Sequence, residues 1–187
     1  PDLGMMYSLN PYQGCEHGCV YCYARNTHEY WGFNAGLDFE SKIIAKKNAP
    51  WLLEKFILNP AWNAVPISVS GNTDCYQPLE RKLKITRGIL EVFARYRHPV
   101  GIITKNSLIL RDLDILTDLA KDDLVHVYIS ITTLNEDLQG VMEPRTASAL
   151  KRLTTVSALA SAGVPVGIMN APIIPGLNDH EIPNILK

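Results

Sequence analysis

Three cysteines lie close together near the start of the sequence, and their side chains could bind a metal. Cys15, Cys19 and Cys22 place thiols after four and then three residues. A disulfide framework fits this spacing poorly, because cysteines so close together rarely pair and one of three would be left over. Clustered thiols are instead typical of a metal site.

The number of cysteines separates two kinds of metal site. Three thiolates on a cubane 4Fe-4S cluster leave one iron free for another ligand, whereas four would close the site. Structural zinc takes four nitrogen or sulfur ligands. The alternative is therefore zinc held by Cys15, Cys19, Cys22 and either His17 or Cys75. Three cysteines on one loop favour the cluster, because zinc ribbons usually supply their ligands as two separated pairs.

Short runs rich in β-branched residues alternate with longer stretches of helical periodicity. The runs predict strands at residues 7–12, 65–70, 100–104, 124–131 and 165–170. Helices are predicted at residues 38–58, 79–97, 110–121 and 148–162, with Pro50 breaking or restarting the first. This alternation indicates βαβ units around a parallel sheet. We expect an α/β fold of about five βα units that forms a partial barrel, with a flat doubly wound sheet as the alternative.

Polar residues follow the later predicted strands, just as the cysteines follow the first. They are Gly71, Asn72, Thr73 and Asp74 after the second strand, Lys105 after the third, Ser130 and Thr132 at the fourth, and Asn170 at the fifth. Each alone could be a turn or helix-capping residue. In parallel barrels, however, reactive groups gather at the carboxyl ends of the strands. The joint placement therefore predicts a ligand site at this end of the sheet.

The cysteine loop resembles the signature of the radical S-adenosylmethionine (radical SAM) superfamily, a Cys-xxx-Cys-x-aromatic-Cys pattern after a first strand. The matching residues are Cys15, Cys19, Tyr21 and Cys22. Residues 70–74, 103–105, 130–132 and 142–145 are similar to the branch that contains spore photoproduct lyase. The resemblance implies a 4Fe-4S cluster whose open iron binds S-adenosylmethionine. It also implies a one-electron donor such as a flavodoxin or ferredoxin, and a 5′-deoxyadenosyl radical that abstracts hydrogen from a substrate.

The same resemblance assigns roles to the polar residues at the strand ends. Thr73 and Asp74 would contact the amino group or ribose of the cofactor, with a helix cap as the alternative. Lys105 would meet the cofactor carboxylate, and Ser130 the ribose or carboxylate. Tyr21 would lie near the adenine. Gly71, Asn72, Thr132 and Asn170 complete the predicted cofactor site.

Two further residues have two interpretations each. Arg145 could bind a cofactor carboxylate or a substrate phosphate, or form an ion pair with Glu143 or a neighbouring acid. In the lyase branch a cysteine near the second-strand motif can return hydrogen to a substrate radical. Cys75 is a candidate for that role, although it lies on the other side of Asp74, and the alternative is a buried inert thiol.

The composition limits partners and location. The 187 residues are 47% hydrophobic and 20% charged, which suits one domain, residues 1–187. A net charge of -1 gives no excess of cations, so a nucleic-acid substrate is not favoured and the substrate stays unidentified. No membrane span or signal peptide is evident, so we expect a cytoplasmic protein. The missing initiator Met and the helix-like start at residues 178–181 predict a fragment, truncated at its C-terminus, of a longer chain.

A second hypothesis belongs to a different class of function. The cysteine loop could stabilise a noncatalytic module, with zinc or an iron–sulfur cluster as a structural element and a binding partner in place of a substrate. An open coordination position separates the two hypotheses, because only the enzyme needs to bind the sulfonium cofactor.

Overall fold

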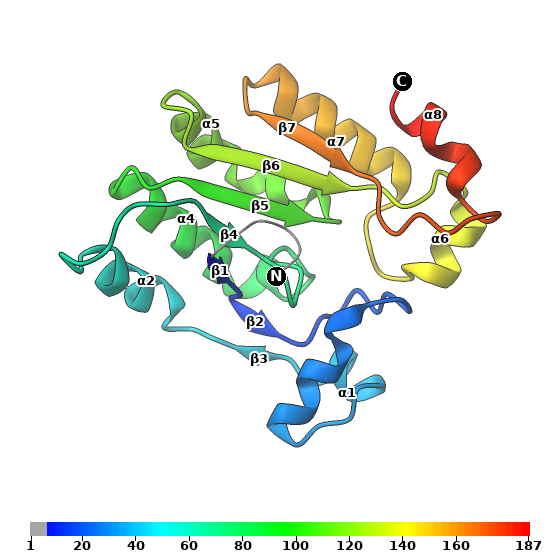
Figure 1. Ribbon diagram of the computed structural model, residues 1–187, viewed down its shortest axis with the longest axis horizontal. Helices are drawn as coiled ribbons and strands as arrows, with labels where there is room; N and C mark the ends of the chain where they lie inside the picture. The colour runs from blue at the N-terminus through cyan, green and yellow to red at the C-terminus, as the bar shows by residue number, and fades with distance from the viewer. Residues whose placement is uncertain (1–6) are drawn as a thin grey trace.

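A parallel sheet organises the computed structural model, which describes residues 7–187. Its strands are β1 (Tyr7–Leu9), β4 (Ile67–Val69), β5 (Val100–Thr104), β6 (Val125–Ser130) and β7 (Val166–Met169). They lie side by side in chain order, each parallel to the next (Figure 1). A doubly wound sheet reverses its strand order at one point. The unreversed order of the described strands therefore excludes that alternative and matches the predicted partial barrel.

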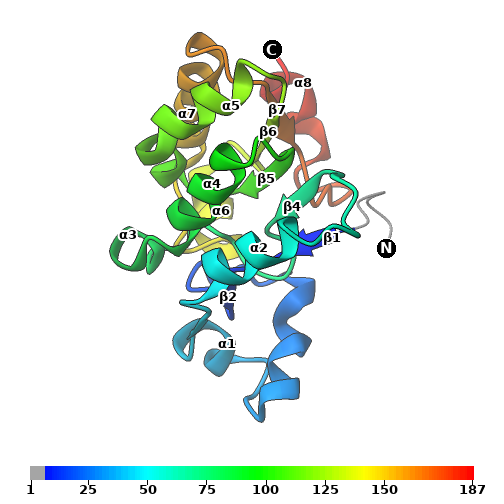
Figure 2. The same cartoon turned by 90° about the vertical axis from the view of Figure 1, so that its left-hand side faces the viewer.

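Helices cover one face of this sheet, as Figure 2 shows. The longer ones are α2 (Ala49–Ile57), α4 (Ile85–Arg95), α5 (Leu113–Ala120) and α7 (Ala149–Ser161). The shorter ones are α1 (Leu37–Ser41), α3 (Glu80–Leu83), α6 (Glu136–Met142), α8 (Ile182–Ile185) and the 3-10 helices η1 (Tyr23–Trp31), η2 (Ser107–Asp112) and η3 (Asp179–Glu181). Strand and helix side chains form one core, in which Val69, Ile102, Val127, Phe93 and Leu116 are fully buried. No helix within residues 7–187 has the length and apolar character to cross a membrane.

The predicted first strand, residues 7–12, is wrong in its second half. β1 ends at Leu9, and β2 (Tyr12–Gln13) pairs antiparallel with β3 (Ile44–Ala45) outside the main sheet. Pro11 accounts for the break, because proline has no N–H to donate to a neighbouring strand. The chain therefore leaves the sheet just before the cysteine loop.

The predicted helix at residues 38–58 is also wrong in part, because β3 separates α1 from α2. The β-branched pair Ile43 and Ile44 favours the extended conformation there. Pro50 lies in the first turn of α2, where its missing N–H needs no partner. The prediction that Pro50 restarts a helix is confirmed.

The helix predicted at residues 79–97 is divided into α3 and α4. Lys84 stands between them with φ 54°, a left-handed conformation that an α-helix cannot continue through. The helix predicted at 110–121 begins earlier, as η2 followed by α5. α6 lies in a segment for which the sequence predicted no element.

Candidate functional site

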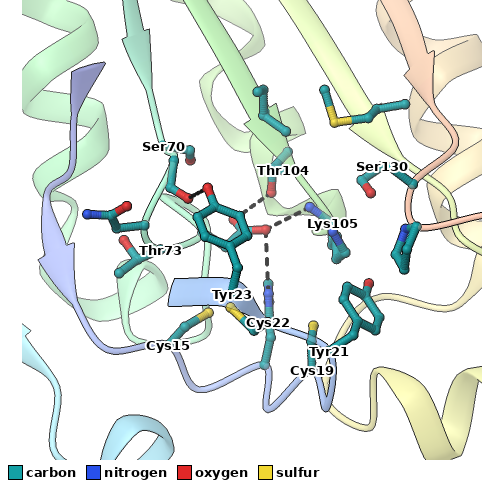
Figure 3. Close-up of a pocket in the computed structure, with 18 residues that line it drawn as sticks. Cys15, Cys19, Tyr21, Cys22, Tyr23, Ser70, Thr73, Thr104, Lys105 and Ser130 are labelled. Atoms are coloured by element: carbon teal, nitrogen blue, oxygen red, sulfur yellow. Dashed lines mark hydrogen bonds and ion pairs between the residues drawn. The ribbon is translucent and has the colours of Figure 1, made fainter. Parts of the chain in front are cut away.

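A cavity of about 400 Å³ lies at the carboxyl ends of the parallel strands. Figure 3 shows the cysteine loop along one side of it and the strand ends along the other. The loop contributes Cys15, His17, Cys19, Tyr21, Cys22 and Tyr23. The strand ends contribute Ser70, Gly71, Asn72, Thr73, Asp74, Ile103, Thr104, Lys105, Ser130, Met169, Ala171 and Pro172. Most of the predicted site residues therefore meet in one place.

Two glycines shape the cysteine loop. Gly14 has φ +81° and Gly18 has φ +69°, in the left-handed region that favours glycine. A Cβ atom at Gly14 would lie 2.9 Å from the Phe39 carbonyl oxygen, and one at Gly18 would lie 2.2 Å from the Arg145 guanidinium. Glycine at both positions lets neighbouring segments pack directly against the loop.

The three cysteine side chains project toward the cavity from this one loop (Figure 3). Burial raises the pKa of the Cys19 thiol to about 12 and also raises the pKa of Cys22, so both thiols must lose a proton to bind metal. Within residues 7–187, no three His, Cys, Asp or Glu side chains are arranged to hold a single metal ion. Of the predicted fourth zinc ligands, His17 faces Asp74 and Cys75 lies in the apolar core. A cubane binds each cysteine through a different iron, so three converging thiols of one loop fit it.

His17, predicted only as an alternative zinc ligand, contacts the strand ends. Its side chain is 1% exposed, and its Nδ1 lies 3.4 Å from the Asp74 carboxylate. Asn106 Nδ2 lies 3.2 Å from His17 Nε2. Burial would lower the pKa of His17, but the Asp74 carboxylate outweighs burial and raises the pKa to about 10. These contacts tie the loop to the segments after β4 and β5.

Asp74 uses its carboxylate within the protein. One oxygen accepts the Tyr76 N–H and the Thr104 hydroxyl, at 2.8 and 2.7 Å. The other accepts the Lys105 N–H at 2.7 Å and faces His17. Burial would raise the pKa of Asp74, but His17 and these donors outweigh it and lower the pKa to about 2. A carboxylate has about four acceptor positions, and here each has a donor.

A buried network lies behind the part of the wall formed by Tyr21 and Ser130. Tyr21 donates its hydroxyl proton to Glu143, which also accepts from Thr132 at 2.7 Å. Glu143 pairs with Arg152 at 2.6 Å, and Arg152 donates to the Ser130 carbonyl at 2.8 Å. Burial would raise the pKa of Glu143, but the Arg152 guanidinium lowers it, so Glu143 is ionised. The network joins the cysteine loop to β6 and α7.

Two groups on the wall are available to a ligand. The Ser130 hydroxyl oxygen is buried and has no hydrogen-bond partner among the described residues. The Lys105 ammonium lies 5.8 Å from the centre of the Tyr21 ring, on the cavity side. A hydroxyl and a cation beside three thiols suit a polar ligand that carries a carboxylate.

Thr132 and Asn170, predicted to bind cofactor, lie behind the lining residues. Thr132 donates to Glu143, and Asn170 Nδ2 donates to the Ile131 carbonyl at 2.7 Å. Asn170 Oδ1 is buried without a partner in residues 7–187. Both side chains join the ends of β6 and β7 rather than facing the cavity.

Arg145 and Cys75 also lie off the cavity wall. Arg145 pairs with Glu40 and donates to the Glu16 carbonyl, which is the predicted alternative of an ion pair with a neighbouring acid. Cys75 is fully buried in the apolar core, as the alternative of an inert thiol predicts. Its place in the core does not suit a residue that must reach a substrate radical.

Comparison with known proteins identifies the family. The family described as the Radical SAM superfamily matches residues 9–187 of the chain. The chain belongs to the radical SAM superfamily. The resemblance of the cysteine loop is thereby confirmed.

Relatives of this radical SAM chain occur in bacteria and archaea. An uncharacterized protein of Mycobacterium tuberculosis is 34% identical over 177 residues, which cover 95% of this chain and 52% of that protein. An uncharacterized protein of Methanocaldococcus jannaschii is 31% identical over 178 residues, which cover 95% of this chain and 64% of that protein. The chain thus spans between half and two thirds of the length of these relatives.

Solved structures with the same fold include those of spore photoproduct lyase. The lyase complexed with dinucleoside spore photoproduct aligns with a TM-score of 0.69 at 19% identity, covering 94% of this chain and 48% of the lyase. A mutant lyase with bound AdoMet and dinucleoside spore photoproduct aligns with a TM-score of 0.67 at 19% identity, covering 92% and 47%. The predicted fold class, a radical SAM partial barrel, is confirmed.

Proposed function

We propose that this chain is the core domain of an enzyme in which Cys15, Cys19 and Cys22 hold a 4Fe-4S cluster and the adjoining cavity binds S-adenosylmethionine. The observation that supports the proposal most is the meeting of three thiols from one loop with four strand ends around one cavity. When bound, cluster and cofactor supply the radical chemistry: one electron breaks the S–C5′ bond, giving methionine and a 5′-deoxyadenosyl radical that takes hydrogen from the substrate.

The polar residues of the cavity would bind and orient the cofactor. Lys105 would attract its carboxylate, and the unpartnered Ser130 hydroxyl would bond its carboxylate or ribose. The Thr73 hydroxyl donates to the Tyr12 carbonyl at 3.3 Å, which leaves its lone pairs to accept from the cofactor ammonium group. These contacts would fix the methionyl part beside the cysteines.

Apolar side chains would protect the reacting centre. Ile103, Met169 and Pro172 line the cavity in or just after β5 and β7. Side chains of this kind exclude water and so limit side reactions of a reactive intermediate.

The electron donor would be a small redox protein such as a flavodoxin or ferredoxin. The dinucleoside bound by spore photoproduct lyase is not carried over to this chain, because a net charge of -1 provides no excess of cations for a phosphate backbone. The proposal therefore specifies hydrogen abstraction and leaves the substrate unassigned.

Anaerobic reconstitution with iron and sulfide tests the proposal. S-adenosylmethionine should change the EPR signal of the reduced cluster, and 5′-deoxyadenosine should form. Cys15→Ala, Cys19→Ala and Cys22→Ala should each abolish both effects, whereas Cys75→Ala, which alters a thiol outside the cavity, should preserve them. Binding of zinc alone, or a reduced cluster that ignores the cofactor, would contradict the proposal.

A further inference from the structure

Gln77 lies between β4 and α3, and its side chain is fully buried. Its Oε1 accepts the Glu16 N–H at 3.0 Å, and its Nε2 donates to the Gly14 carbonyl at 3.2 Å. A residue in a parallel sheet bonds the neighbouring strand in the same way. It donates to the carbonyl of the residue before the one it faces and accepts the N–H of the residue after it. The Gln77 amide thus acts as a short strand paired with Cys15.

Other contacts complete the hold on this part of the loop. The Cys15 N–H donates to the Phe39 carbonyl at 2.9 Å. The Glu16 carboxylate accepts the Leu79 N–H at 2.5 Å, so residues 14–16 and 77–79 bond one another in both directions. The protein therefore fixes the backbone on both sides of Cys15 with its own groups.

We propose that Gln77 is the positioning residue that fixes Cys15 for the cluster. The inference rests on the proposed function, in which Cys15 is a ligand. A site works only when its ligands are held near the productive geometry by supporting hydrogen bonds, and such partners alter metal affinity roughly 10- to 100-fold. Cys19 has separate support, because Arg25 donates twice to its carbonyl, at 3.0 and 3.1 Å.

Gln139 offers a matched control within the same chain. Its side chain is also buried; Nε2 donates to the Ala147 carbonyl at 3.0 Å, and Oε1 accepts the Ala149 N–H at 3.1 Å. The amide therefore brackets Ser148, the residue that caps α7, in the way that Gln77 brackets Cys15. Loss of either amide removes two such bonds to the backbone, and loss of Gln139 also removes one to the Thr146 hydroxyl, but only Gln77 touches the cysteine loop.

The test compares Gln77→Leu with Gln139→Leu in two states of the protein. In the metal-free protein we expect the Glu16 amide to exchange hydrogen at least about tenfold faster in Gln77→Leu only. In the reconstituted protein we expect that variant to lose iron to a chelator roughly 10- to 100-fold faster, with a shifted cluster potential. Gln139→Leu should match wild type in all three measurements. If Gln77→Leu does not fold, Gln77→Glu replaces it, because the carboxylate keeps the acceptor for Glu16 and loses the donor to Gly14.

Two results would overturn the inference: wild-type exchange and iron retention in the Gln77 variant, or equal changes in the Gln139 variant. Failure of the wild type to assemble a cluster would overturn the proposed function instead. The exchange measurement on metal-free protein would then still decide whether Gln77 holds the loop.

Discussion

Arg152 Nη2 lies 2.6 Å from Glu143 Oε2, and neither side chain is exposed to solvent. Arg97 and Asp118 form a comparable pair at 2.8 Å, with side chains 38% and 49% exposed. Loss of one buried partner leaves a charge that its surroundings solvate poorly, whereas water solvates the surface pair. We expect Glu143→Gln to lower the free energy of unfolding by about 3–5 kcal/mol. Asp118→Asn should lower it by at most about 1 kcal/mol. Urea denaturation of the reduced, metal-free protein measures both changes.

A double variant checks the cause of that loss. Arg152→Met removes the unpaired cation, so adding it to Glu143→Gln should restore much of the lost stability. Equal losses in Glu143→Gln and Asp118→Asn, or no recovery in the double variant, would show that the buried pair does not act in this way.

Gly14 and Gly32 share a left-handed backbone, with φ +81° and +75°, but differ in their surroundings. A Cβ at Gly32 meets nothing within 4 Å, so Gly32→Ala should cost only about 1–2 kcal/mol of unfolding free energy, from the conformation. A Cβ at Gly14 meets His28 and the Phe39 carbonyl. Gly14→Ala should therefore lower the free energy of unfolding by about 1–3 kcal/mol more than Gly32→Ala does. Denaturation followed by circular dichroism measures both. Equal costs would mean that the loop can move away from Phe39.

His98 forms hydrogen bonds that suit the neutral ring. Its Nε2 accepts the Trp62 indole N–H at 3.0 Å, and its Nδ1 donates to the Pro99 carbonyl at 2.9 Å. Burial lowers the pKa of His98 below its ordinary value of 6.5. The unfolded chain therefore protonates His98 at a higher pH than the folded protein does. The stability that neutral His98 contributes is complete above about pH 6.5 and is lost as the pH falls through the lower pKa of the folded protein.

The corresponding experiment compares wild type with His98→Gln, because glutamine keeps a donor and an acceptor but does not titrate. Other groups also titrate in this range, so the prediction concerns the difference between the two proteins. Between about pH 7.5 and pH 5.5, the free energy of unfolding should fall more steeply in wild type. Parallel curves from urea denaturation would rule out a contribution from His98.

Lys105 should affect cofactor binding without affecting the cluster. A charge-assisted hydrogen bond contributes about 1.5–3 kcal/mol, so Lys105→Met should weaken S-adenosylmethionine binding roughly 10- to 100-fold. Iron content should remain at the wild-type value, because Lys105 supplies no metal ligand. Lys121→Met, at a side chain 72% exposed, serves as the control and should change neither quantity. Titration of the cofactor, followed by the EPR signal of the reduced cluster, measures the affinity. An unchanged affinity would contradict a role for Lys105 in binding the cofactor.

The main sheet could be predicted from the sequence because its strands are short, apolar and separated by helices. Residues 100–104 form β5 as predicted, and the strand predicted at 124–131 is β6 with one residue fewer at each end. β2 and β3 could not be predicted, because each has two residues and depends on a partner about thirty positions away. Local patterns determine the buried parallel strands, whereas distant contacts determine the small pair that carries the cysteine loop.

The candidate site divides in a similar way. The sequence predicted which strand ends meet, because parallel strands bring their carboxyl ends to one edge. It did not predict Gln77 or the partners of His17, which depend on loop geometry. Arg152 could have been found from the sequence, because it lies on the same buried stripe of the predicted helix as Ala149 and Leu159. A buried cation requires an acidic partner.

The unreversed strand order separates two tasks along the sequence. The residues proposed to hold the cluster all lie before β4, whereas Met169, Ala171 and Pro172 belong to the wall added by the last strand. Each strand pairs with its chain neighbours in the main sheet, so a changed loop after β7 would alter the wall formed by the last strand and leave the earlier strand pairings intact. A changed loop after β6 would reach further, because Glu143 and Arg145 in that segment bond Tyr21 and the Glu16 carbonyl of the cysteine loop.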